Sequence, residues 1–288
     1  MKLFIFLILS GLLSTNCFAQ ADTVLSDTGT DTVVSKSTLT FGATYCNNAD
    51  YYGQKSTDNI PYLALSATYR FRSGIYFSGL AYRLLTDTVN VISAGNFRAG
   101  FIFNISKKIS ADLSYSHSFY PSYSPLLQAS NPDNASATIT YENFLTSKLS
   151  FDYAFGAATD FFVTAGMGKQ INLGHITDKD ILSTTPSMNI TAGTQQFYQT
   201  YLTEQKLEDS LLGTLLTPLT GPRVTPVSKT VTTTRFSLLS YNFNLPLAYS
   251  RAGYMIEINY QISLLSSQAE SGPGKINSFF TASFYYQL

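Results

Sequence analysis

The stretch Ser278-Phe279-Phe280-Thr281-Ala282-Ser283-Phe284-Tyr285-Tyr286-Gln287-Leu288 closes the sequence and carries its clearest pattern. Successive side chains of a β-strand point to opposite faces of its sheet. One face of this stretch therefore collects Phe280, Ala282, Phe284, Tyr286 and Leu288. Because these side chains are apolar or aromatic and none is charged, the stretch predicts a β-strand that turns one side toward an apolar environment.

The same alternation recurs upstream, for example in residues 63–71, where every second residue is apolar. We expect about twelve such strands of roughly ten residues, the length that a tilted strand needs to cross a bilayer. No segment after residue 21 has the run of about 18 apolar residues that a membrane helix requires. Strand counts of about ten or about fourteen remain open. The connection near 157–160 is short for an outer loop, and the one at 171–183 is long for an inner turn.

The second face of these strands is mostly Ser, Thr, Gly, Asn and Ala, with single charges. The charges that we expect to face a lumen have both signs: Arg70, Arg83, Arg98, Asp112, Glu142, Asp152 and Glu257. Charged residues make up only 12% of the chain, about half the usual share of a soluble protein. A soluble β-sandwich would carry many Lys and Glu on its second face. The sequence therefore predicts an all-β fold, a transmembrane antiparallel up-and-down β-barrel, closed because lipid cannot satisfy an open sheet edge.

The connections alternate in length. Short turns at 72–74, 106–108, 146–148 and 250–253 alternate with longer loops at 47–60, 85–93, 119–134, 196–231 and 265–276. Outer-membrane barrels show this asymmetry, with short periplasmic turns and long outer loops. Within the largest loop, the leucine spacing of Tyr201–Leu216 favours a short amphipathic helix.

The N-terminus reads as a secretory signal peptide over residues 1–21. Lys2 is the positive residue, Leu3–Leu13 is the apolar segment, and Ala19-Gln20-Ala21 offers the cleavage site. Residues 22–36 are rich in Thr, Ser and Asp and predict a flexible periplasmic lead-in, so the barrel would occupy 37–288. Cys17 raises a rival reading as a lipoprotein, although Asn16 stands where a lipobox has Gly, Ala or Ser.

The aromatic face of the last strand resembles the C-terminal β-signal of bacterial outer-membrane β-barrel proteins. Phe280, Phe284, Tyr286 and Leu288 carry the resemblance, and Leu288 stands where the family usually has Phe. The resemblance implies export to the outer membrane of a Gram-negative cell. It implies as partners the outer-membrane lipids and the barrel-assembly machinery, which recognises this signal. The aromatic-rich composition and the Asp- and Thr-rich N-terminal tail look like those of an uncharacterised barrel family rather than of a named porin.

Candidate chemistry is sparse. His117, in Ser116-His117-Ser118, is expected on the lipid-facing side near the outer end of a strand, where an outer-membrane lipid hydrolase would need its base. Adjacent Ser and His point to opposite faces, however, so an interfacial histidine is the better interpretation. His175 lacks metal-ligand spacing, and Asp178-Lys179-Asp180 reads as a solvated turn. We expect no catalytic residue, no metal and no cofactor. We also expect no nucleic-acid partner, because the net charge of the chain is zero.

Three functions follow from this interpretation. The first is a passive channel for small solutes, favoured by a polar lumen face of mixed charge. The second is a structural or partner-binding protein that displays the loops at 119–134 and 196–231 to an unknown partner. The third, and least favoured, is a lipid hydrolase that uses His117. The sequence itself names no solute, pore state, oligomer or partner.

Overall fold

The computed structural model describes residues 36–122, 124–198, 235–269 and 275–288. The expected signal peptide, the lead-in up to residue 35 and the loop helix expected at 201–216 lie outside these ranges.

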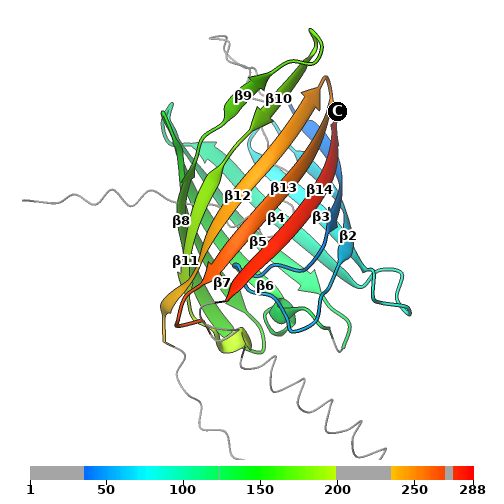
Figure 1. Ribbon diagram of the computed structural model, residues 1–288, viewed down its shortest axis with the longest axis vertical. Helices are drawn as coiled ribbons and strands as arrows, with labels where there is room; N and C mark the ends of the chain where they lie inside the picture. The colour runs from blue at the N-terminus through cyan, green and yellow to red at the C-terminus, as the bar shows by residue number, and fades with distance from the viewer. Residues whose placement is uncertain (1–35, 123, 199–234, 270–274) are drawn as a thin grey trace, which may run out of the picture.

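Twelve antiparallel strands form a closed barrel, and two further strands lie outside it (Figure 1). The expectation of an all-β barrel with about twelve strands is confirmed. The barrel strands are β1 (Thr38–Cys46), β2 (Tyr62–Arg70), β3 (Ile75–Leu84), β4 (Ala94–Asn104), β5 (Ile109–Phe119), β6 (Asp133–Glu142), β7 (Thr146–Phe155), β8 (Thr159–Gly168), β11 (Ser187–Gly193), β12 (Ser237–Arg251), β13 (Tyr254–Leu265) and β14 (Ile276–Gln287).

The first and last strands close the ring. Strand β1 pairs antiparallel with β14, with Phe41 opposite Tyr286 and Ala43 opposite Phe284. The side chains that carry the resemblance to the β-signal, including Phe284 and Leu288, point outward and are exposed. Closure gives the backbone of β1 a hydrogen-bonding partner on both sides, so neither of these two strands is left as an edge.

The connection expected as a long inner turn at 171–183 forms a hairpin of β9 (Ile171–Gly174) and β10 (Asp180–Thr184). Strand β10 pairs with residues 247–251 of β12, and β11 pairs with residues 237–244 of the same strand. One long strand therefore serves two partners in succession, and the hairpin continues the sheet beyond the barrel rim (Figure 1).

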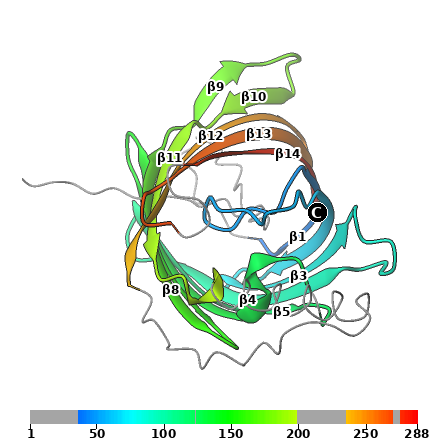
Figure 2. The same cartoon turned by 60° about the horizontal axis from the view of Figure 1, so that its bottom comes forward.

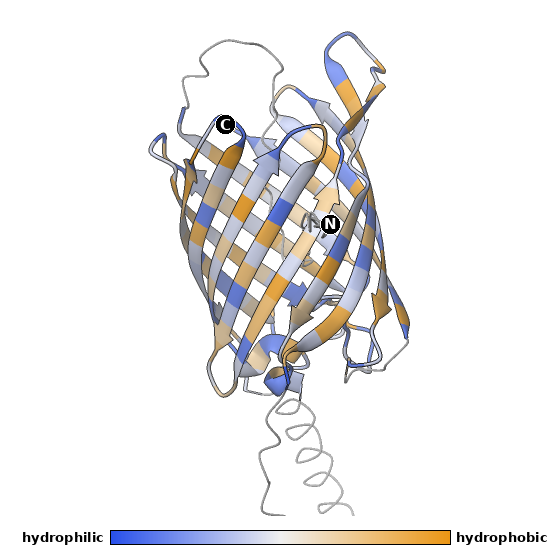
Figure 3. Ribbon diagram, turned by 90° about the vertical axis from the view of Figure 1, so that its left-hand side faces the viewer, coloured by the Kyte–Doolittle hydropathy of each residue, from blue (hydrophilic) through white to orange (hydrophobic). Residues whose placement is uncertain are grey.

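The two faces of the wall differ in polarity, as the alternation of the sequence predicts. Large apolar side chains point outward and are exposed, among them Leu65 at 64% and Leu245 at 60%. Small polar side chains such as Thr44, Ser116 and Ser263 point inward and are buried. Polar and apolar residues alternate along the strands in Figure 3. An apolar belt of this kind costs free energy in water and is stabilised by lipid.

The two ends of the barrel also differ. At the turn end, residues 71–74, 105–108, 143–145 and 252–253 join neighbouring strands, and Thr38 and Leu288 lie there too. Gly74 makes the first of these turns possible, because its φ of +92° is unfavourable for other residues and a Cβ would clash with the carbonyl oxygen of Ile102. At the loop end lie longer connections, including 47–61 and 85–93, together with residues 124–132 before β6 and residues 266–269 after β13.

One short helix lies in the loop between β5 and β6. It is the 3-10 helix η1 (Leu127–Ser130), and Leu127 is buried against the loop end of the barrel. Within the described ranges, no helix is long and apolar enough to cross a membrane.

Candidate functional site: the lumen and its inner loop

Six of the seven charges expected in the lumen lie at inward positions of the register: Arg70, Arg98, Asp112, Glu142, Asp152 and Glu257. Arg98, for example, stands opposite Ser78 and Ser116, whose side chains face inward. Glu142 lies at the exposed turn end of β6. The inward side chains of β2 to β8, which include five of these six, are called the charged wall below.

The prediction that Arg83 faces the lumen is wrong. Arg83 pairs with Leu63, which is exposed on the outer face, so its side chain points outward at the loop end of β3. The interpretation failed because β3 does not alternate cleanly. Its inward positions near the loop end hold Tyr82 and Leu84, which belong to a buried apolar cluster. Because β3 has apolar side chains on both faces, the sequence pattern does not show which face Arg83 occupies.

Two carboxylates of the charged wall accept hydrogen bonds from neighbouring side chains. The hydroxyl of Tyr76 donates to Asp112, at 3.2 Å from each carboxylate oxygen. Asp152 accepts from the hydroxyl of Ser136, and the amide of Asn134 lies 3.5 Å from it. These polar groups lower the cost of holding a charge away from water.

The inward face of β11 to β14 has a different character. Six buried or half-buried carboxamide side chains lie there, and we call them the amide wall: Asn189, Asn242, Asn244, Asn259, Gln261 and Asn277. Ser240 and Ser263 stand between them, and both are fully buried. Among the inward positions of these four strands, Glu257 is the only charged residue. The barrel interior therefore has one charged wall and one nearly neutral, amide-rich wall.

The loop at 47–61, called L1 below, folds into the barrel instead of projecting from it. Figure 2 shows L1, in blue, inside the ring of strands. Three donors of the amide-wall strands bind oxygen atoms of L1. Ser240 Oγ donates to the carbonyl of Tyr52 at 2.6 Å, Asn277 Nδ2 to the carbonyl of Gly53 at 2.8 Å, and Gln261 Nε2 to the Asp50 carboxylate at 2.8 Å.

The tip of L1 is aromatic and packs on the barrel wall. Tyr52 stacks on Phe162 of β8, with ring centroids 4.1 Å apart and an angle of 20° between the planes. Tyr51 makes an edge contact with Phe162 and lies 4.6 Å from Phe197 by ring centroids. All four rings are buried, together with Leu239 of β12. Aromatic contacts of this kind add about 0.5–1.5 kcal/mol per pair to the burial of area.

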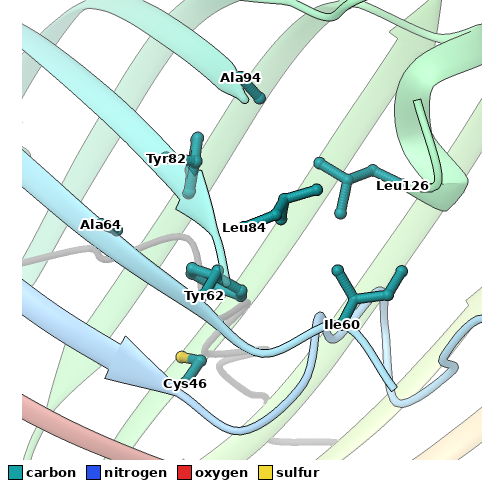
Figure 4. Close-up of a cluster of buried hydrophobic side chains, with 8 residues drawn as sticks. All are labelled: Cys46, Ile60, Tyr62, Ala64, Tyr82, Leu84, Ala94 and Leu126. Carbon is teal, nitrogen blue, oxygen red and sulfur yellow. The ribbon is translucent and has the colours of Figure 1, made fainter. Parts of the chain in front are cut away.

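The return arm of L1 packs against the other side of the lumen. Ile60 lies in a buried cluster with Tyr62, Tyr82 and Leu84, and Leu126 of the loop between β5 and β6 completes it (Figure 4). L1 therefore contacts β2 and β3 through one cluster, and β8 and β12 through the other.

Local polar contacts fix the shape of L1. The side-chain oxygen of Asn48 accepts from the backbone N–H groups of Ala49 and Ile60, each at 2.9 Å, and so ties the two arms together. Asp50 accepts from the N–H of Gly53 at 2.7 Å and closes a tight turn in which Tyr52 and Gly53 have φ of 52° and 84°. Burial raises the pKa of the Asp50 carboxyl to about 7, although the hydrogen bonds from Gln261 and Gly53 lower it.

Asp160 connects three segments at the loop end. It is fully buried and accepts from Asn131 Nδ2 at 2.9 Å, from Thr194 Oγ1 at 2.6 Å, and from the N–H groups of Gln196 and Phe197 at 2.8 and 2.7 Å. A buried carboxylate is stable only with such donors. This residue holds the loop between β5 and β6, the start of β8 and the segment after β11 in one arrangement.

His117 lies on the outer face, as expected, where it pairs with Asp133 of β6. Its Nδ1 is 2.7 Å from the Asp133 carboxylate, which also accepts from the Tyr115 hydroxyl at 2.5 Å. Ser116 and Ser118 point the other way, because they stand opposite Arg98 and Asn96 on the inward face. The Ser-His-Ser sequence is therefore divided by the wall. In the described part of the chain, no group of three or more His, Cys, Asp or Glu is placed to hold a metal ion.

Sequence reasoning predicted a loop at 47–60 but missed that it folds into the barrel, and it missed the roles of Asp50 and Asp160. L1 does carry a signal, because the run Asn-Ala-Asp-Tyr-Tyr-Gly at 48–53 holds two aromatics and a turn glycine where a solvated loop has charged residues. The sequence offers no comparable signal for Asp160, whose partners lie 29 to 37 residues away along the chain.

No family model matches the chain, and no curated protein matches its sequence. Among solved structures, it is similar to the KdgM porin, with 8% identity, a TM-score of 0.45, and 86% of this chain and 98% of that chain covered. It is also similar to an outer membrane channel from Pseudomonas putida F1, with 10% identity, a TM-score of 0.47 and coverage of 91% and 99%. It is also similar to LpxR from Salmonella typhimurium, with 7% identity, a TM-score of 0.42, and 86% of this chain and 99% of that chain covered.

Proposed function

We propose that this protein is an outer-membrane β-barrel that passes small polar solutes through its lumen, and that L1 constricts the passage. The observation that carries the proposal is the opposite polarity of the two faces of one closed wall. The outward face is apolar around the ring, and the inward face holds charges, hydroxyls and amides. A closed barrel with these faces is stable in lipid and keeps a polar interior.

The membrane part of the proposal predicts where the protein is found. The mature chain should fractionate with the outer membrane and migrate differently on gels before and after boiling, because hydrogen-bonded closed barrels resist detergent until heated. Recovery in the soluble periplasm would contradict it.

The channel part is tested by planar-bilayer recordings of the purified, folded protein in KCl. We expect discrete conductance steps that are smaller than those of a 16-stranded porin, because twelve strands enclose a narrower lumen and L1 occupies part of it. The absence of steps at every applied voltage would exclude a channel.

A second candidate, a partner-binding role for the loop end, is favoured by one observation. Asp160 fixes three segments there, so part of the loop surface is preorganised. Pull-down from outer membranes with the full chain and with a chain lacking residues 201–216 tests it. A partner retained by the first and lost by the second supports this role, and identical recoveries contradict it.

A further inference from the structure

The amide wall is the region of the lumen whose polar groups are least satisfied. The side-chain oxygens of Asn242, Asn259 and Asn277 are shielded from solvent and have no hydrogen-bond partner among the described residues. A buried polar atom without a partner destabilises the fold, so such groups in a native protein call for an explanation. Their side chains project from three neighbouring strands, β12, β13 and β14, toward the lumen.

The same wall already binds a set of oxygen atoms. Ser240, Gln261 and Asn277 donate to two backbone carbonyls and one carboxyl group of L1. L1 therefore satisfies donors of the wall, whereas the three orphaned acceptors need O–H or N–H groups that L1 does not supply. A molecule rich in hydroxyl groups would satisfy both, because each hydroxyl donates one hydrogen bond and accepts others.

The charge of the wall narrows the ligand class. No Lys or Arg occupies an inward position of β11 to β14. An anionic solute would have to leave water without a cation to receive it, which is costly. The single carboxylate, Glu257, stands two inward positions away from Gln261 along β13 and belongs to the turn-end half of that strand.

Resting on the proposed channel function, we infer that the inward face of β12 to β14 is a binding subsite for neutral polyhydroxylated solutes, such as sugars, and that L1 occupies it until a solute displaces the loop. The loop and the solute then compete for the same donors. This competition gives opposite effects for two kinds of variant, which a merely structural role of these residues does not predict.

Saturation-transfer NMR on the full, detergent-folded protein measures the binding with glucose as the probe. Asp50→Ala removes the contact from L1 to Gln261 and leaves the wall intact, so it should tighten glucose binding about fivefold, the net worth of one ordinary hydrogen bond. Adding Asn242→Ala and Asn259→Ala to this variant should weaken binding about tenfold. Asn96→Ala on β4, an amide of the charged wall, is the matched control and should leave binding unchanged.

The charge of the probe tests the ligand class. Glucose should give a stronger signal than glucuronate, which adds a carboxylate that no cation of this wall can receive. Equal or tighter binding of glucuronate, or a signal that Asp50→Ala lowers or the asparagine variants leave unchanged, would overturn the inference. Folding is checked by the gel shift on heating. Because this measurement needs no current, failure of the channel proposal and failure of the subsite give different results.

Discussion

The two halves of the barrel solve the same problem in different ways. Both must bury polar side chains inside a ring of strands. The charged wall does so with ionised groups that neighbouring hydroxyls support, as Tyr76 supports Asp112. The amide wall does so with neutral carboxamides, two of which, Gln261 and Asn277, bind L1. A charge requires a permanent partner, whereas an amide can exchange one partner for another at low cost. On the inference above, the charged wall is the fixed wall and the amide wall is the exchangeable one.

The largest effect is expected at the seam where β14 of the amide wall meets β1. Deleting residues 284–288 removes the partners of β1 from Thr40 to Ala43. It also removes Leu288, whose backbone N–H and carbonyl both form hydrogen bonds with the backbone of Leu39. Each backbone group left unpaired in lipid costs several kcal/mol, so insertion should be abolished. Membrane fractionation with protease protection measures it. Deletion of residues 22–35 is the control and should insert normally, and normal insertion of the first deletion would refute closure through β14.

A pH effect should distinguish the exchangeable wall. Asp50 has a pKa of about 7 when L1 is seated, against an ordinary value of 3.8 when the loop is released into water. The seated state therefore binds the proton more tightly. The equilibrium constant that favours seated L1 over released L1 is greatest below pH 3.8. It falls about tenfold for each pH unit between 3.8 and 7. Single-channel conductance of the wild type should rise over this window and level off above it.

Two variants show whether Asp50 causes that dependence. Tyr62, the first residue of β2, is a titratable side chain near Asp50. Glu257 lies on the same inward face of β13 as Gln261, which binds Asp50. Asp50→Asn should remove the pH dependence, and Glu257→Gln should keep it. If Glu257→Gln removed the dependence instead, the titrating group would belong to the strand and not to L1.

A smaller effect should mark the charged wall. Arg98→Glu changes the charge of the lumen by two units and should shift the ratio of cation to anion permeability about two- to threefold toward cations. Reversal potentials in a KCl gradient measure it. Arg83→Glu is the same substitution on the outer face of β3 and should leave the ratio unchanged. Equal shifts from both variants would contradict the placement of Arg83.

The wall could be predicted from the sequence because its information is local. Period-two alternation needs only neighbouring residues, so strand number and most inward charges follow from it. The pairing of the first and last strands follows from the need to close the sheet in lipid. Arg83 was misplaced where a second cluster, at Tyr82 and Leu84, made both faces of β3 apolar. The hairpin of β9 and β10 was missed because its strands, of four and five residues, are too short to show a clear alternation of apolar and polar residues.

The interior of the barrel could not be predicted for the opposite reason. The contacts of L1 with Ser240, Gln261 and Asn277 join residues 188 to 224 positions apart. Asparagine and serine at alternate positions of a strand predict only a polar face. Nothing in such a pattern distinguishes a face that meets water from one that binds a loop, because both need the same hydrogen-bonding groups.

The central claim is that the lumen conducts and that L1, seated on the amide wall, limits the current. Gly53→Val tests it most directly. A Cβ at this position would lie 2.5 Å from Oδ1 of Asn242 and 2.9 Å from Oγ of Ser240, and φ of +84° disfavours valine. Gly79→Val, at an outward position of β3 with nothing within 4 Å, is the control.

The measurement is the single-channel conductance of the wild type and the two variants in one planar-bilayer setup. We predict steps for all three proteins, with a conductance about twofold or more larger for Gly53→Val than for the wild type, because the loop leaves a narrow lumen, and unchanged for Gly79→Val. Equal conductance of Gly53→Val and the wild type would contradict the role of L1, and the absence of steps from all three would contradict the channel itself.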